Sequence, residues 1–146
     1  MAFDGITIHA LVDELQKELI GKRISKIAQP ESEELLFTIK QPKGNIRLLI
    51  SANASLPLVY LTNENKKAPD TAPNFCMVLR KHIANGRITD IQQMDFERVI
   101  RFTVEHLDEL GDTREKYLYV EIMGSHSNII FCNHENRIID SMKRSS

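Results

Sequence analysis

Residues 34–52, ELLFTIKQPKGNIRLLISA, contain two apolar runs joined by a short polar segment. The runs at 34–40 and 46–52 are rich in leucine, isoleucine, phenylalanine and threonine, a composition typical of strands bounded by turns. The connecting segment QPKGN carries Pro42 and Gly44, which favour turns. The stretch therefore predicts an antiparallel hairpin with a largely buried core.

The same pattern continues along the chain. Strands are also expected at 23–29, 58–62, 88–93, 98–105, 116–123, 128–133 and 137–141. Helical spacing of apolar residues occurs at 8–20, with Thr7 as N-cap and Gly21 as stop, and at 73–85, with Pro73 at the first position and Gly86 after the end. We expect an α+β fold, an antiparallel two-sheet β-sandwich or barrel with two flanking helices. The polar segment 62–73 is predicted to be a mobile loop.

Size and composition limit the classes of protein that fit. With 146 residues, 42% of them hydrophobic, the chain is expected to form one domain over 1–146. Its 19 Lys and Arg against 20 Asp and Glu give a net charge of -1, so any basic surface for nucleic acid must be local. No segment approaches the roughly 18 apolar residues of a membrane span, and the N-terminus lacks a signal pattern.

The two cysteines indicate the cellular compartment, and the end of the sequence suggests a longer protein. Cys76 and Cys132 form no CxxC pair, which favours reduced thiols in a cytoplasmic protein, although one long-range disulfide is an alternative. The chain stops directly after a strand-like segment. We therefore expect an N-terminal piece of a longer protein.

Two basic segments are candidates for binding. Arg80 and Lys81, with His82, lie near the expected end of the second helix, where cations favour the helix dipole or could contact nucleic-acid phosphates. Glu97 and Arg98 open a strand, either as a solvated strand end or as a site where Arg98 reads a phosphate or base edge.

The segment EIMGSHSNII, residues 121–130, has a turn composition with one unexplained residue. Gly124 suits a positive φ, and Ser125, Ser127 and Asn128 suit local side-chain to backbone bonds. His126 could be a buried imidazole, a general base or an RNA contact. Hydrolase elbows, phosphate loops and paired metal-ligand spacings are lacking in the sequence, so no catalytic residue, metal or cofactor is expected.

Several motifs together resemble a known family. These are FDG (3–5), GKRISKIAQP (21–30), NFCMVLRKH (74–82), DFERVI (95–100) and EIMGSHSNII (121–130). In this order, across nearly the whole chain, they are similar to the NFACT-N domain that opens bacterial RqcH proteins. That family is related to eukaryotic NEMF and is also called the fibronectin- or fibrinogen-binding protein A family.

The resemblance implies a cytoplasmic ribosome quality-control factor. It would bind the stalled large ribosomal subunit with its peptidyl-tRNA and recruit alanyl-tRNA for untemplated C-terminal alanine tailing, leaving peptide transfer to the ribosome. Helix-hairpin-helix, coiled-coil and NFACT-R domains follow in the family and are absent from these 146 residues. The older family name implies an alternative, an adhesin domain that binds fibronectin or fibrinogen, and a purely structural scaffold is a third possibility.

The family fold is similar to the N-terminal domain of formamidopyrimidine-DNA glycosylases. Those enzymes use an N-terminal proline amine followed by glutamate, and Ala2 and Phe3 stand at these places, so no glycosylase activity is expected. The family's Asp-Arg pair for tRNA falls on Glu97 and Arg98. Arg80 and Lys81 are the second tRNA-binding candidates. A possible RNA-contact loop comprises His126, Ser127 and Asn128, which face either RNA or neighbouring loops of the protein, with Ser125 where relatives often carry a basic residue.

Overall fold

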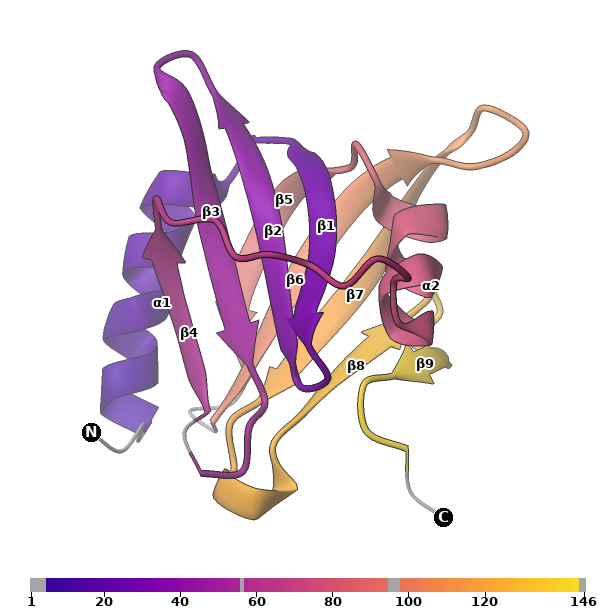
Figure 1. Cartoon of the computed structure of the whole chain (residues 1–146). Helices are drawn as coiled ribbons and strands as arrows, with labels where there is room; N and C mark the ends of the chain where they lie inside the picture. Colours follow the sequence, from indigo (N-terminus) through magenta and orange to yellow (C-terminus); the bar gives the residue numbers. More distant parts are fainter. Residues whose placement is uncertain (1–4, 56, 95–97, 145–146) are drawn as a thin grey trace.

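The computed structural model describes residues 5–55, 57–94 and 98–144. Within these residues the chain forms two α-helices, nine strands and one 3₁₀ turn. The elements are α1 (Gly5–Leu19), β1 (Ile24–Glu31), β2 (Glu34–Gln41), β3 (Gly44–Ser51), β4 (Leu58–Thr62), α2 (Asn74–Ile83), β5 (Arg87–Gln93), β6 (Val99–Leu107), β7 (Thr113–Glu121), η1 (Gly124–His126), β8 (Asn128–Cys132) and β9 (Ile138–Ser141) (Figure 1).

The strands form two antiparallel sheets in simple sequence order. One sheet contains β1 to β4 and the other contains β5 to β9. The predicted hairpin at 34–52 is confirmed, since β2 and β3 pair in continuous register from Glu34↔Ser51 to Gln41↔Gly44. All nine predicted strands are present, with ends shifted by a few residues; the expected strand at 116–123 runs over Thr113–Glu121 instead.

The sheets are two open layers, so the α+β sandwich is confirmed and the barrel alternative is wrong. They meet along one edge, where Arg23 and Arg87 form an isolated bridge and the Ile24 amide donates to the Gly86 carbonyl at 2.8 Å. Among the described strands, β4 and β9 end their sheets without pairing to each other. The expected likeness to glycosylase N-terminal domains stays a prediction.

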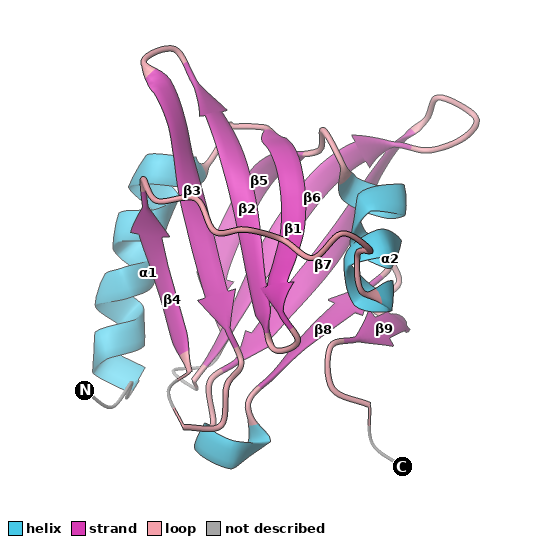
Figure 2. Cartoon of the chain, in the orientation of Figure 1, coloured by secondary structure: helices cyan, strands magenta, loops and turns pink. Residues whose placement is uncertain are grey.

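The core fills the space between the sheets because alternate strand residues point inward. Inward residues include Leu35, Phe37 and Ile39 of β2 and Ile100 and Phe102 of β6, all buried in one cluster. The two helices flank the sandwich on opposite sides (Figure 2). Their apolar residues join the same cluster: Ile8, Val12, Leu15 and Leu19 from α1, and Phe75, Cys76, Leu79 and Ile83 from α2.

The helix ends differ in detail from the sequence prediction. Helix α1 begins at Gly5, so Thr7 lies inside it, and Ile20 lies past its end with 42% of its surface exposed. Gly21 ends the helix as predicted, with a φ of 88° that suits glycine. Pro73 occupies the N-cap position, with extended backbone angles, because the helix proper begins at Asn74.

The segment between β4 and α2, predicted to be mobile, crosses the outer face of the first sheet (Figure 1). Ala68 packs there against Ala28, Leu36 and Leu49. The Lys66 ammonium pairs with Glu34 at 2.6 Å, which raises the pKa of Lys66. The segment is therefore attached to the sheet at two points.

Both cysteines, Cys76 and Cys132, are free and buried, as the reduced-thiol interpretation predicts. Burial raises the pKa of each thiol, which keeps the unreactive protonated form dominant. Among the helices of the described residues, none has the length and apolar character needed to cross a membrane.

Candidate nucleic-acid interface

Arg98 lies directly before β6, and its side chain is exposed. Its backbone carbonyl accepts a hydrogen bond from the Ile122 amide at 2.8 Å, which fixes Arg98 beside the segment that leads into η1. The guanidinium is therefore available to a ligand while the backbone beneath it is held. Its predicted partner, Glu97, lies outside the described residues.

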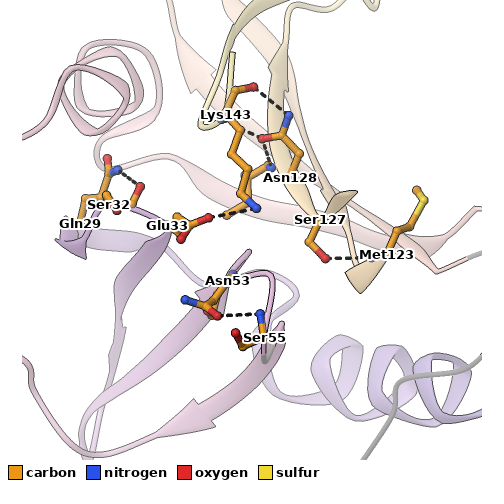
Figure 3. A network of polar contacts seen from close by, with 11 residues as sticks. Gln29, Ser32, Glu33, Asn53, Ser55, Met123, Ser127, Asn128 and Lys143 are labelled. Carbon is orange, nitrogen blue, oxygen red and sulfur yellow. Dashed lines mark hydrogen bonds and ion pairs between the residues drawn. The ribbon is translucent and has the colours of Figure 1, made fainter. Parts of the chain in front are cut away.

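The 121–130 segment forms η1 and its flanking turns. Gly124 has a φ of 56°, which supports the predicted use of glycine there. The Ser127 side chain is fully buried, and its hydroxyl accepts a hydrogen bond from the Met123 amide at 2.9 Å (Figure 3). The expectation that Ser127 offers its hydroxyl to RNA does not fit this geometry, because that oxygen closes the turn from inside.

Asn128 is also engaged within the protein. Its Oδ1 accepts from the Lys143 amide at 2.9 Å, and its Nδ2 donates to the Lys143 carbonyl at 3.0 Å (Figure 3). The Lys143 ammonium in turn pairs with Glu33 of the β1–β2 turn at 3.0 Å. Of the three residues predicted as an RNA-contact loop, His126 is the exposed one, and contact through it stays a prediction.

The two residues of the second basic candidate, Arg80 and Lys81, contact different parts of the protein. Arg80 is exposed, but its Nε donates to the Ile27 carbonyl at 2.8 Å and ties α2 to β1. Lys81, the next residue, turns toward the other side and lines a cavity of about 380 Å³ together with His82 and His106. This agrees with the sequence argument that adjacent helical residues do not share a face.

The two basic candidates lie at opposite ends of β6. Arg98 precedes the strand, whereas Lys81 lines its cavity beside His106 near the strand's other end. His106 follows Arg98 by eight positions along extended chain, a span of about 26 Å. The structure therefore brings Arg98 together with η1 and leaves Lys81 in a separate basic group.

That second group contains two residues that the sequence reasoning missed. Lys116 of β7 is 9% exposed, and its Nζ lies 2.7 Å from Nε2 of His106 on β6. The sequence did indicate this position, because residues alternate between the two faces of a strand and Lys116 falls on the same buried face as Leu118 and Val120. A lysine at an inward position of a strand is unusual and deserves a structural or functional reason.

Burial is the main cause of the altered titration in this group. It lowers the pKa of Lys116, His82 and His106, and the Lys116 charge lowers the pKa of both imidazoles further. The His106 ring is therefore neutral near pH 7. It has Nδ1 at 3.2 Å from the Leu107 carbonyl, which requires the proton on Nδ1 and leaves Nε2 to accept from Lys116.

Comparison with known proteins identifies the family to which this fold belongs. The family model for the NFACT N-terminal and middle domains matches residues 4–146. The chain belongs to the NFACT family. This confirms the resemblance drawn from the motifs.

Curated NFACT relatives carry ribosome quality-control names. The Rqc2 homolog RqcH of Bacillus subtilis (strain 168) is 42% identical over 147 residues, which cover 100% of this chain and 26% of the relative. Ribosome quality control complex subunit 2 of Saccharomyces cerevisiae is 31% identical over 136 residues, 92% of this chain and 12% of that protein. The chain thus spans about a quarter or less of these relatives' length.

Solved structures of similar proteins share the fold closely. The N-terminal domain of fibronectin-binding protein PavA from Streptococcus pneumoniae matches with a TM-score of 0.94 and 36% identity, over 99% of this chain and 55% of that one. The fibrinogen binding protein from Staphylococcus aureus matches with a TM-score of 0.89 and 34% identity, over 100% and 52%.

Proposed function

We propose that this chain is the N-terminal part of a cytoplasmic ribosome quality-control factor. The factor binds the large ribosomal subunit with its peptidyl-tRNA and recruits alanyl-tRNA for untemplated alanine tailing. The chain itself contributes binding and positioning, and peptide transfer stays with the ribosome. Membership of the NFACT family and the RqcH names of its relatives support this proposal.

The exposed side chain of Arg98 is the observation that carries the proposal. It stands where the family resemblance places an arginine for tRNA, and its backbone is fixed by the bond to Ile122. A guanidinium held at a strand entry can donate to phosphate oxygens or to a base edge. The exposed His126 lies on the segment that follows Ile122, so it is the second candidate contact at this end.

Arg98→Ala in the full-length protein tests the proposal. We expect alanine tailing of stalled chains to be lost, because the variant removes a charge-assisted contact to tRNA. The melting temperature of the domain should stay nearly unchanged, since an exposed side chain contributes little to the core. Tailing in cells and thermal unfolding of the purified protein are the two measurements.

Arg137→Ala is the matched control. Arg137 is also an exposed arginine, and it lies in the turn between β8 and β9, away from Arg98 and η1. The control should keep full tailing. Normal tailing with Arg98→Ala would contradict a role for this end of the domain in tRNA recruitment.

Binding of a matrix protein is the second candidate function. The solved relatives are described as fibronectin- or fibrinogen-binding proteins, and this description favours an adhesin domain as the alternative. The two candidates differ in salt dependence. Binding to RNA phosphates releases counterions and weakens steeply as salt rises, whereas binding to a matrix protein need not.

A further inference from the structure

Lys116 is a buried cation that forms no ion pair in the described part of the chain, and Asp108, itself paired with Arg114, acts on it only at longer range. Its side chain projects from the inner face of the second sheet, beneath the C-terminal turn of α2, and only 9% of the residue is exposed. No described carboxylate forms an ion pair with it; its hydrogen-bond partner is His106. Removing an ammonium from water is costly unless an anion or several acceptors replace the solvent.

The His106 imidazole satisfies one donor of Lys116 but does not neutralise it. Because Nδ1 faces the Leu107 carbonyl, Nε2 offers a lone pair to the ammonium at 2.7 Å. A neutral ring supplies a dipole and no negative charge. Within the described part of the chain, two of the three donors of the ammonium group therefore stay available.

These groups line open space. Lys81, His82, His106 and Lys116 surround a cavity of about 250 Å³, and the first three also line the neighbouring cavity of about 380 Å³. His82 is held in place by ring contact with Phe131, with centroids 5.7 Å apart. Nitrogen donors from α2 and β7 thus converge on one space, and His106 of β6 holds the Lys116 ammonium there.

Two of the nearby carboxylates are already neutralised by arginines. Glu105 pairs with Arg87 at 3.2 Å. Asp108 pairs with Arg114 at 3.1 Å, and bonds to the carboxylate from the Asp112 amide, above all, lower the pKa of Asp108. Glu109, the third acid of the lining, is exposed on the β6–β7 turn. The cavity therefore has the two ammonium charges of Lys81 and Lys116 against one carboxylate, Glu109, that no described arginine pairs with.

The backbone carbonyls at the end of α2 and in the turn after it do not supply further acceptors for Lys116. The Ile83 carbonyl accepts from the Gly86 amide at 3.0 Å. The Asn85 carbonyl accepts from Nη1 of Arg23 at 3.0 Å. Both are used in closing the turn that leads from α2 into β5.

We propose that this cavity binds a phosphate group, held by the ammonium groups of Lys116 and Lys81 and flanked by the imidazoles of His82 and His106. A tetrahedral oxyanion accepts donors from several directions, and Lys116, Lys81 and His82 supply them here, while His106 holds Lys116 in place. The ligand is either free phosphate or a phosphodiester of nucleic acid, which share this chemistry. The inference stands independently of the proposed function, since it rests on the charge and geometry around Lys116.

The test is a titration of the 146-residue chain followed by ¹H–¹⁵N NMR. One arm adds inorganic phosphate, and the other adds a short single-stranded RNA at the same ionic strength. We expect saturable shifts of the His106 and His82 ring signals in at least one arm. Lys116→Met should weaken this binding about tenfold or more, the loss expected for one charge-assisted hydrogen bond.

Three further variants make the result specific. Lys81→Met removes an exposed lysine and should weaken binding without disturbing the core. His106→Gln keeps an acceptor for Lys116 and tests whether the ring signals report the site. Lys43→Met, an exposed lysine in the β2–β3 turn outside the cavity lining, should bind like the parent.

Each outcome decides the proposal. Shifts with phosphate that are lost in both Lys116→Met and Lys81→Met support it with free phosphate as ligand. Shifts with RNA alone, lost in the same variants, support it with a phosphodiester as ligand. Absence of saturable shifts in both arms, or equal binding by Lys116→Met and Lys43→Met, overturns it.

Discussion

At the scale of single residues, the domain uses its few polar inward side chains in two ways. Ser127 and Asn128 close turns and hold the C-terminal segment, and their polar atoms are matched within the protein. Lys116 has His106 as its one hydrogen-bond partner in the described structure, and it lies at the edge of a cavity. Full internal pairing indicates a structural role, whereas a buried charge beside open space indicates a ligand.

The imidazoles of His82 and His106 should make stability fall on acidification. Both have a pKa below the usual 6.5, mainly through burial, so the unfolded chain binds more protons than the folded one below about that pH. The Lys116 charge adds to the effect at both rings and the Lys81 charge at His82, whereas Asp108 opposes it at His106. We expect the free energy of unfolding to decrease from pH 7.5 to 5.5 in urea titrations.

His106→Gln identifies the source of this pH dependence. The variant removes one titrating ring and should flatten the decrease, whereas His9→Gln, at an exposed position on α1, should leave it as in the parent. An equal decrease in the His106→Gln and His9→Gln variants would mean that His106 does not titrate as its surroundings require.

At the scale of elements, the local sequence pattern predicted the individual strands but not how the strands assemble into sheets. The period of two and the turn residues located every strand, because strand formation follows side-chain alternation along one segment. The chain's division into two open sheets could not be predicted, since it depends on the β1–β5 contact between residues far apart in sequence. The polar start of β7 at Thr113–Glu115 was missed because pairing with β6, and not burial, holds it in the sheet.

Gly86, in the turn between α2 and β5, is packed tightly against β6. A Cβ at this position would lie 2.5 Å from Cγ1 of Val104 and 2.9 Å from the Ile83 carbonyl oxygen. We therefore expect Gly86→Ala to lower the free energy of unfolding by about 1–3 kcal/mol through overpacking. Chemical denaturation measures the change.

Ala84→Ser, at an exposed position in the same turn, is the control for Gly86→Ala and should be close to neutral. If Gly86→Ala proved equally neutral, the contact between the α2–β5 turn and β6 would be looser than the structure shows.

At the scale of the whole molecule, a net charge of -1 is combined with basic groups at the two ends of β6. The sequence located Arg98, Arg80 and Lys81, but their separation and the Lys116 cavity depend on the tertiary fold. Because its 19 Lys and Arg are balanced by 20 Asp and Glu, we expect the domain to bind RNA only weakly by itself. The domains that follow in the longer relatives would raise its affinity by linkage.

Filter binding of tRNA to the full-length protein at graded salt tests the central claim that this domain contacts tRNA through Arg98. We expect affinity to fall steeply as salt rises, and Arg98→Ala to reduce the slope of log K against log salt by about one, the loss of one phosphate contact. Arg137→Ala should keep the parent slope. Binding that is insensitive to salt, or a slope unchanged by Arg98→Ala, would contradict the account.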